Sequence, residues 1–240
     1  MNGGDDMTET DLDGTIDWDA YWTVTDDVST DTANLSAQHA DDVLTALAAE
    51  TGAESVADVG CGGGAAAFAV AERHPNTAVI GYDAAESVLD ANRERAREEG
   101  VGNVRFERAI LPDFESGTAF DLVFSYFTLP YVRDVERALR NLHDAVAPGG
   151  ALVCNYLNEN AREYCLEAAE NPHAHEDHAF VFDPDSYTER FAALLDGDSV
   201  LGDDRISDAL GVEPQSAWSV VDRPDTRWAW HHAPLVYVPK

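Results

Sequence analysis

One glycine-rich segment constrains the fold more than any other part of this chain: Asp58-Val59-Gly60-Cys61-Gly62-Gly63-Gly64-Ala65. A short, partly β-branched run at 55–57 precedes it and predicts the end of a buried strand. Small, helix-favouring residues follow at 66–73 and predict a helix. A strand, a glycine turn and a helix form the first unit of a nucleotide-binding α/β fold. The turn needs glycines because it is tight and because a ligand must approach bare backbone there.

Glycine spacing alone does not decide which cofactor such a turn binds. Gly60-x-Gly62-x-x-Ala65 also fits the dinucleotide pattern, in which a pyrophosphate lies at the helix N-terminus. Asp58 favours a different ligand, because a carboxylate at the strand end opposes a pyrophosphate and suits a cation. S-adenosylmethionine carries no phosphate and has a sulfonium and an α-ammonium group. A glycine turn without any ligand is the remaining alternative.

The segment resembles the first motif of class I S-adenosylmethionine-dependent methyltransferases, an acidic residue followed by x-Gly-x-Gly-x-Gly. Asp58, Gly60, Gly62 and Gly64 occupy its positions. The Phe-Asp-Leu-Val run inside a strand predicted at 119–126 is similar to the same family. So is Pro148-Gly149-Gly150, which we expect to end a helix at 132–146 and to precede a strand at 151–154. The resemblance covers residues 55–155, the cofactor half of the chain.

The resemblance implies an α/β fold with a Rossmann-like sheet of seven mostly parallel strands. Their expected order is 3-2-1-4-5-7-6, with the last strand antiparallel and helices on both faces. Besides the elements named above, the pattern predicts helices at 34–49, 84–98 and 184–195 and strands at 78–82, 104–106, 216–221 and 232–238.

Cofactor contacts follow from the same resemblance. Asp83 ends the second strand and can accept both ribose hydroxyls, or it can cap the helix predicted at 84–98. The aromatic element at 17–22 either closes over the cofactor or packs the N-terminal segment onto the domain. Many family members place an acid near Ala109 for the adenine amino group; this chain has none, so backbone groups and Ile110 would contact adenine. The remaining implied contacts are Trp22, Cys61, Ala84 and Ser125.

Methyl transfer needs alignment of the two reactants and exclusion of water more than it needs a universal catalytic residue. The family builds its acceptor pocket from the N-terminal segment and from insertions after strands four and five. Aromatic residues there favour a small, partly apolar acceptor: Trp18, Trp22, Phe127 and Tyr131. Tyr126 is the first candidate for a general base, followed by Tyr131, Asn155, Tyr156, Glu159, His231 and His232.

Three alternative functions remain open from the sequence. The first is a methyltransferase that acts on protein or RNA, although no basic groove is visible in the sequence. The second is a nicotinamide-dependent oxidoreductase, and the third is a cofactor-binding relic without turnover. Asp58 and Pro148-Gly149-Gly150 oppose the oxidoreductase, and the missing acid near Ala109 is the feature that favours a relic.

The net charge of −31 comes from 46 acidic and 15 basic residues, and Lys240 is the only lysine. Acidity spread in this way resembles that of proteins adapted to molar salt, in which screening reduces self-repulsion. The alternative is an acidic protein that avoids or binds particular partners. Charge therefore says little about the substrate, and no basic stripe with aromatic residues favours nucleic acid.

We expect a disordered acidic tail at 1–15 and a single domain at 16–240. Within that domain, 16–50 would form an N-terminal lid and helix, 51–157 the cofactor-binding half, and 158–240 the substrate-side insertions and closing strands. The start of the chain lacks signal-peptide features, and no apolar run reaches membrane-spanning length. Cys61, Cys154 and Cys165 lack CxxC spacing. These features predict a soluble, cytoplasmic monomer or homodimer with reduced thiols.

One possible metal motif stands in the sequence at His173-Ala174-His175-Glu176-Asp177-His178. Its spacing is that of the metallo-β-lactamase superfamily, whose imidazoles bind zinc. That motif follows a strand in a two-sheet fold and needs distant ligands, whereas here it lies in an acidic connector of another fold. We therefore expect a polar loop and no metal.

Overall fold

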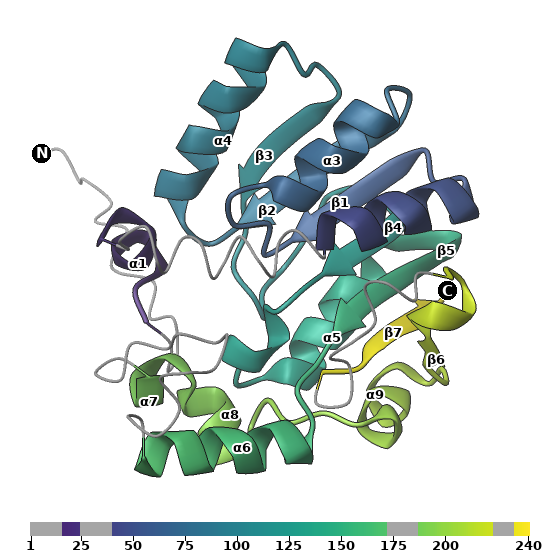
Figure 1. The fold of residues 1–240 in the computed structure, drawn as a ribbon. Coiled ribbons are helices and arrows are strands. Elements are labelled where there is room, and N and C mark those ends of the chain that lie inside the picture. The colour runs from purple at the N-terminus through teal and green to yellow at the C-terminus, as the bar shows by residue number, and fades with distance from the viewer. Residues whose placement is uncertain (1–15, 25–39, 172–186, 223–232) are drawn as a thin grey trace, which may run out of the picture.

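The computed structural model describes residues 16–24, 40–171, 187–222 and 233–240 (Figure 1). Its centre is a seven-stranded sheet in the order β3-β2-β1-β4-β5-β7-β6. Strands β1 to β5 pair in parallel, whereas β7 is antiparallel to both β5 and β6. The predicted order and the antiparallel last strand are confirmed. The bounds are β1 (Ser55–Val59), β2 (Ala78–Asp83), β3 (Val104–Arg108), β4 (Phe120–Ser125), β5 (Val146–Asn155), β6 (Gln215–Ser216) and β7 (Leu235–Pro239).

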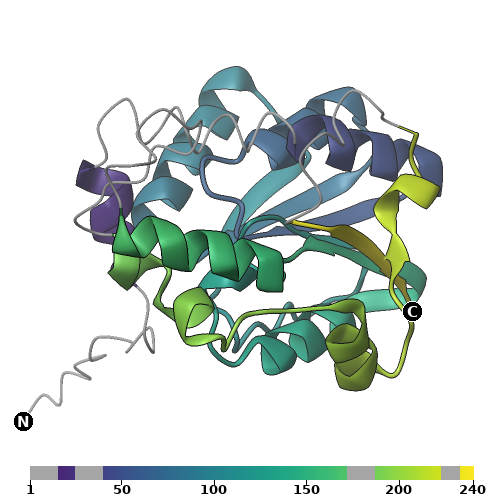
Figure 2. The same ribbon diagram turned by 60° about the horizontal axis from the view of Figure 1, so that its bottom comes forward.

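Helices cover both faces of the sheet (Figure 2). Residues 40–51, also helical, lie with α3 and α4 on one face, and α5 and α9 lie on the other. The bounds are α1 (Trp18–Val24), α3 (Ala65–Arg73), α4 (Glu86–Glu99), α5 (Val135–Asp144), α6 (Glu159–Glu170), α7 (Tyr187–Arg190), α8 (Ala192–Asp196) and α9 (Asp203–Leu210). Short 3-10 turns form η1 (Leu129–Tyr131) and η3 (Ala217–Ser219).

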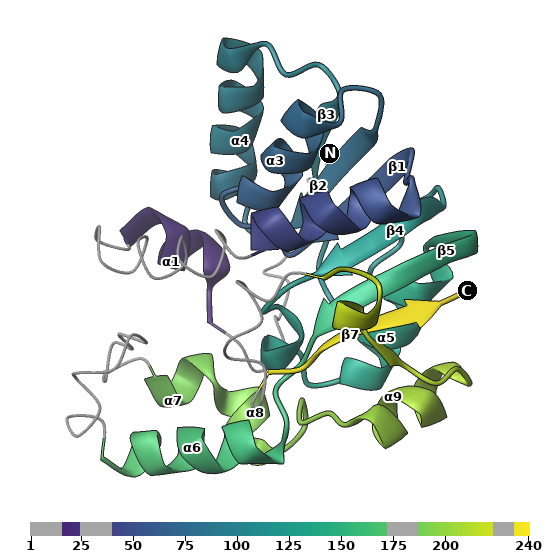
Figure 3. The same cartoon turned by 45° about the vertical axis from the view of Figure 1, so that its right-hand side comes forward.

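Strand β1 shows why both faces need covering. Its apolar side chains alternate, so that Val56 joins the core on the α3 side and Ala57 joins the core on the α5 side. A parallel strand buried on both faces carries an almost continuous apolar run, as β1 does. A third apolar cluster joins α6 to α8 beyond the sheet. Figure 3 shows this α6–α8 segment and α1 on the side toward which the parallel strands point.

The expectation that Pro148-Gly149-Gly150 ends a helix is wrong. Helix α5 ends at Asp144, and β5 already begins at Val146. The two glycines serve an irregularity inside the strand, where the β4–β5 register shifts between Phe120 and Leu122. A Cβ on Gly150 would lie 2.4 Å from the Asp121 carbonyl oxygen, so this close passage of two backbones requires glycine.

Other boundaries also differ from the sequence prediction. The strand expected at 216–221 keeps only its first residue in β6, because η3 follows directly. The helix expected at 184–195 is two short helices, α7 and α8, separated at Phe191, and its first residues lie outside the described part. The tail at 1–15, the histidine motif at 173–178 and the two histidines at 231–232 also lie outside it. The division of the chain into segments stays a prediction.

The described residues lack two further features. None of their helices is both long and apolar enough to cross a membrane. They also contain no cluster of three or more potential metal-binding side chains.

Candidate active site

The glycine turn between β1 and α3 is held against β2 by backbone hydrogen bonds. The N–H groups of Gly60 and Cys61 both donate to the Tyr82 carbonyl oxygen, at 2.7 and 2.9 Å. Gly60, Gly62 and Gly64 have φ angles of 82°, 48° and 75°, in the left-handed region that residues with a Cβ rarely adopt. The chain therefore turns sharply at the carboxyl edge of the sheet, where the parallel strands end.

Side chains from distant segments of the chain pack closely against this turn. A Cβ on Gly60 would lie 2.0 Å from the Thr128 Oγ1, and a Cβ on Gly62 would lie 3.1 Å from the Trp22 ring. Helix α1 thus brings Trp22 onto the turn, a contact that fits both interpretations of the aromatic element at 17–22. Thr128 was not among the predicted residues, and no sequence signal links it to a glycine 68 positions earlier.

Asp58 lies near the end of β1, between Gly81 of β2 and Phe124 of β4. Its side chain is buried and accepts a hydrogen bond from the Ala67 N–H. Its Oδ2 atom has no hydrogen-bond partner among the described residues. Burial and, second to it, the charge of Asp83 raise the pKa of Asp58 to about 7. A buried carboxylate with one oxygen that accepts no hydrogen bond from the described residues is suited to bind a cationic group.

Asp83 joins the end of β2 to the glycine turn. Its Oδ2 accepts from the Gly62 N–H at 2.8 Å, and its Oδ1 accepts from the Ala85 N–H at 3.0 Å. Burial raises the pKa of Asp83, and these hydrogen bonds oppose the rise. The alternative interpretation of Asp83 as the helix cap is wrong, because the N-cap of α4 is Ala85 and no side chain caps it. The side chain of Asp83 is half-buried, and the Ala84 N–H is a third backbone donor to it, so about one of the roughly four acceptor sites of the carboxylate remains.

Three other predicted contacts lie along the same edge, at the ends of β2 and β3. Ala84, Ala109 and Ile110 are half-buried, and the Ala109 N–H donates to the Asp83 carbonyl oxygen at 2.9 Å. Asn92 of α4, which was not predicted, donates to the Gly62 carbonyl oxygen at 2.8 Å. The structure therefore gathers the ends of β1, β2 and β3 around one turn.

Cys61 and Ser125 complete the set of predicted cofactor contacts. Burial, with the charges of Asp83 and Asp58, raises the pKa of the Cys61 thiol well above its ordinary value, which argues against a reactive thiolate. Ser125, at the end of β4, is fully buried, and its Oγ has no partner among the described residues. The Ser125 Oγ is thus, with the Asp58 Oδ2, a second polar atom near the carboxyl edge that lacks a hydrogen-bond partner among the described residues.

The candidate bases fit a general-base role poorly. The ring of Tyr126 stacks on Phe124 with centroids 5.8 Å apart, and burial raises the pKa of its phenol. A neutral phenol is a weak base near neutral pH. Tyr156 donates its hydroxyl to Asp203 at 2.8 Å, and Glu159 pairs with Arg162 at 2.9 Å.

Asn155 supports the backbone beyond β4 instead. Its Oδ1 accepts from the N–H of Phe127, whose φ of 52° is unusual for a residue with a side chain. Its buried Nδ2 has no partner in the described part of the chain.

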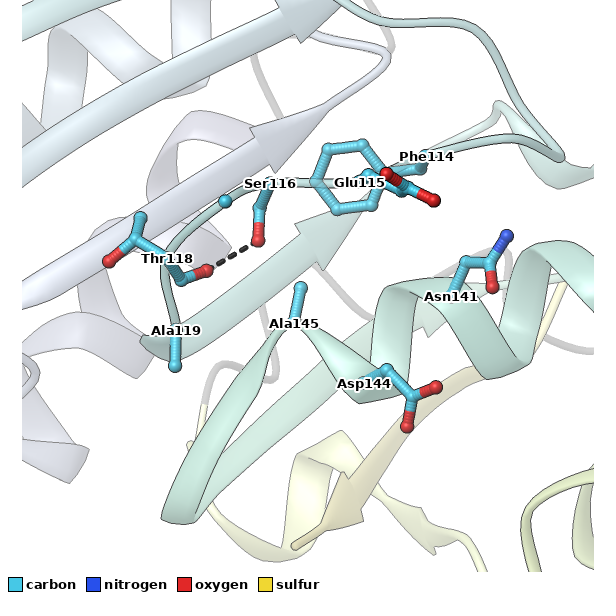
Figure 4. Close-up of a pocket in the computed structure, with 9 residues that line it drawn as sticks. Phe114, Glu115, Ser116, Thr118, Ala119, Asn141, Asp144 and Ala145 are labelled. Carbon is cyan, nitrogen blue, oxygen red and sulfur yellow. Dashed lines mark hydrogen bonds between the residues drawn. The ribbon is translucent and has the colours of Figure 1, made fainter.

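An open hollow of about 460 Å³ lies elsewhere, beside the segment that leads into β4 (Figure 4). That segment enters the amino end of β4, whereas the glycine turn lies at the carboxyl end of β1. Polar groups of the hollow bond to their own surroundings: Ser116 donates to the Thr118 carbonyl, and Asn141 donates to the Pro112 carbonyl at 2.6 Å. We therefore do not assign the active site to this hollow.

Sheet order, the glycine turn after β1 and the acids at the ends of β1 and β2 agree with what the resemblance to class I methyltransferases implies. In agreement, residues 57–152 match the family described as "Methyltransferase domain". Among solved structures, the plantazolicin methyltransferase BpumL, in complex with SAH, superposes with a TM-score of 0.62 at 12% identity, covering 91% of this chain and 92% of that one. An O-methyltransferase family protein from Burkholderia thailandensis gives 0.54 at 21% identity, covering 83% and 54%.

Two curated relatives match part of the chain. The ubiquinone biosynthesis O-methyltransferase of Ruegeria pomeroyi is 32% identical over 110 residues, which are 45% of this chain and 43% of the relative. The trans-aconitate 2-methyltransferase of Deinococcus radiodurans is 32% identical over 109 residues, which are 45% and 40%. The chain thus spans less than half the length of either relative.

Proposed function

We propose that this chain transfers a methyl group from S-adenosylmethionine to a small-molecule acceptor and leaves S-adenosylhomocysteine. The observation that carries the proposal is the state of Asp58, whose carboxylate is buried beside the glycine turn and whose Oδ2 has no hydrogen-bond partner among the described residues. A pyrophosphate would meet this negative charge, whereas a sulfonium or ammonium group would offset it. The names of the matched relatives, which are methyltransferases of small molecules, support the same reaction.

Each residue would act by binding or positioning. Asp83 would accept a ribose hydroxyl with its remaining acceptor site, and Asp58 would balance positive charge near the turn. Trp22 would cover the turn and exclude water. When bound, the cofactor supplies an electrophilic methyl group. The acceptor atom would form a bond to that carbon as the carbon–sulfur bond breaks, so catalysis would depend on alignment of the two molecules.

The alternatives have less support. No observation favours protein or RNA as the acceptor, and a relic without turnover is favoured by one feature of the sequence, the missing acid near Ala109. A nicotinamide cofactor would bring its pyrophosphate to the turn beside Asp58, which opposes the oxidoreductase. The cytoplasmic location and the choice between monomer and homodimer stay predictions.

The proposal predicts that S-adenosylmethionine and S-adenosylhomocysteine raise the melting temperature of the protein and that NAD does not. At a ligand concentration of about 100 Kd, binding to the folded state stabilises it by about 2.7 kcal/mol. Differential scanning fluorimetry in molar KCl measures the shift for each ligand. Stabilisation by NAD alone would overturn the methyltransferase proposal in favour of the oxidoreductase.

We further propose that the protein is adapted to high salt. Exposed ion pairs such as Arg73–Asp42 and Arg97–Glu94 engage some arginines, but 46 acidic residues face only 15 basic ones. Such surface pairs each contribute little, so uncompensated repulsion should dominate in dilute buffer.

This adaptation predicts a melting temperature at least about 5 °C higher in about 2 M than in about 0.1 M KCl, since screening weakens the repulsion. A thermal melt followed by circular dichroism measures it. Sucrose at equal osmolality is the control, because it stabilises proteins without screening charge. An unchanged melting temperature in KCl would show that the acidity has another cause.

A further inference from the structure

One guanidinium lies inside a group of aromatic rings that three separate segments contribute. We name this group the Arg190 cluster; its members are Trp18, Tyr21, Tyr131, Arg190 and Phe191. The Cζ atom of Arg190 lies 4.7 Å from the Tyr21 ring centroid, 5.6 Å from that of Phe191 and 5.8 Å from that of Tyr131. Trp18 closes the group, with its ring centroid 4.9 Å from that of Tyr131.

The guanidinium of Arg190 has no carboxylate partner among the described residues. Its Nη2 donates to the Tyr131 hydroxyl at 3.4 Å, and the Tyr21 hydroxyl also accepts from the guanidinium. Its buried Nε has no partner within residues 16–24, 40–171, 187–222 and 233–240. Eight other arginines in the described part form ion pairs with Asp or Glu: Arg73, Arg93, Arg95, Arg97, Arg133, Arg137, Arg162 and Arg205. A largely buried cation that pairs with no carboxylate of the described segments is unexpected in a chain with 46 acidic residues.

The aromatic rings offset only part of the free energy lost when the Arg190 guanidinium is removed from water. Their faces attract a cation, but a guanidinium has five N–H donors, and most of those on Arg190 lack an acceptor in the described part of the chain. An external anion that brings two oxygens would complete the site, because a carboxylate matches the planar guanidinium in a bidentate pair.

The Arg190 cluster lies next to the glycine turn. Helix α1 contributes Trp18 and Tyr21 to the cluster, and Trp22 of the same helix lies against Gly62. On the other side, the Tyr131 N–H donates to the Thr128 carbonyl at 3.1 Å, and the Thr128 side chain faces Gly60. The cluster is thus within one helical turn of residues that touch the glycine turn, on the carboxyl edge of the sheet.

We propose that Arg190 binds the carboxylate of an anionic acceptor whose apolar part lies against the aromatic rings of the cluster. This inference rests on the proposed function and narrows it to small organic acids. Arg190 would act as a specificity residue that positions the acceptor for attack on the methyl group of the donor.

The test compares acids with their neutral amides. The probes are 4-hydroxybenzoate against 4-hydroxybenzamide and phenylacetate against phenylacetamide, titrated into protein with and without saturating S-adenosylhomocysteine and followed by NMR. In at least one pair, wild-type protein should bind the acid at least tenfold more tightly than the amide. Arg190→Gln should abolish the preference, and Arg190→Lys should retain part of it. Arg97→Gln removes a positive charge from an exposed ion pair and should leave the preference intact.

Two results would overturn the inference: no acid preference in either pair with the wild-type protein, or an unchanged preference in Arg190→Gln. Arg190→Lys keeps the charge, so it separates loss of the anion site from a structural loss of the cluster. The affinity for S-adenosylhomocysteine, measured separately by calorimetry, tests the proposed function. If that ligand binds and no acid preference exists, only the assignment of Arg190 fails.

Discussion

Replacing Asp58 with asparagine should weaken the binding of S-adenosylmethionine by about 30-fold or more. The buried carboxylate would lose its charge while the cationic groups of the ligand remain, and removing one partner of a buried, hydrogen-bonded charge pair costs at least about 2 kcal/mol. Isothermal titration calorimetry at pH 7.5 or above, where the wild-type carboxylate is mostly ionised, measures the change.

The same substitution should stabilise the ligand-free protein at alkaline pH. The folded pKa of Asp58 is about 7, above the ordinary value of about 4 in the unfolded chain. The folded state therefore binds the proton more tightly, and wild-type stability falls as pH rises from about 4 to about 7. An asparagine side chain does not titrate, so the variant should match the wild type at pH 4 and exceed it, by on the order of 4 kcal/mol, at pH 8.

Proton release on binding of S-adenosylmethionine gives a third comparison between the wild type and Asp58→Asn. A cation bound beside Asp58 lowers the pKa of its carboxyl, so wild-type protein should release close to one proton per ligand at about pH 6. Calorimetry in two buffers that differ in ionisation enthalpy counts the protons. Asp113→Asn is the matched control, because Asp113 is an exposed carboxylate paired with Arg137. Wild-type affinity and proton release in the Asp58 variant would refute the role of Asp58.

Local pattern and resemblance to a family account for most of what could be predicted from the sequence. The strand, glycine turn and helix from β1 to α3 follow from short-range composition, because few conformations suit four glycines between a partly β-branched run and an alanine-rich run. Strand order came from the resemblance. Asp58, Asp83 and Trp22 were predicted, and all three lie around the turn.

What the sequence could not predict depends on contacts between distant segments. Thr128 meets Gly60 and Arg190 meets Tyr21 only after folding, and no local pattern links either pair. Pro148-Gly149-Gly150 misled because the same tripeptide that ends helices also permits two backbones to pass closely inside a strand pair. Asp83 looked like a helix cap because it precedes a helix, but its oxygens accept from the glycine turn and from Ala85.

Substitution of Gly60 by alanine should lower the free energy of unfolding by about 2–5 kcal/mol. A residue with a Cβ at φ 82° bears about 1–2 kcal/mol of backbone strain. The new methyl group would also lie 2.0 Å from the Thr128 Oγ1 and 2.8 Å from its Cβ, an overpacking that costs about 1–3 kcal/mol more. Denaturant unfolding in molar KCl measures the loss.

A double-mutant cycle separates the two causes of that loss. Thr128→Gly removes the atoms that the new methyl group would meet. The double variant should therefore lose the overpacking penalty of Gly60→Ala and keep only the penalty from backbone strain. Gly63→Ala is the control in the same turn, because no atom lies within 4 Å of its Cβ position, and its stability should stay within about 0.5 kcal/mol of wild type. If Gly60→Ala is equally mild, the turn can open away from Thr128, and the close packing of Thr128 on the glycine turn is not needed for the fold. If the two substitutions at 60 and 128 add without coupling, backbone strain alone accounts for the requirement for glycine.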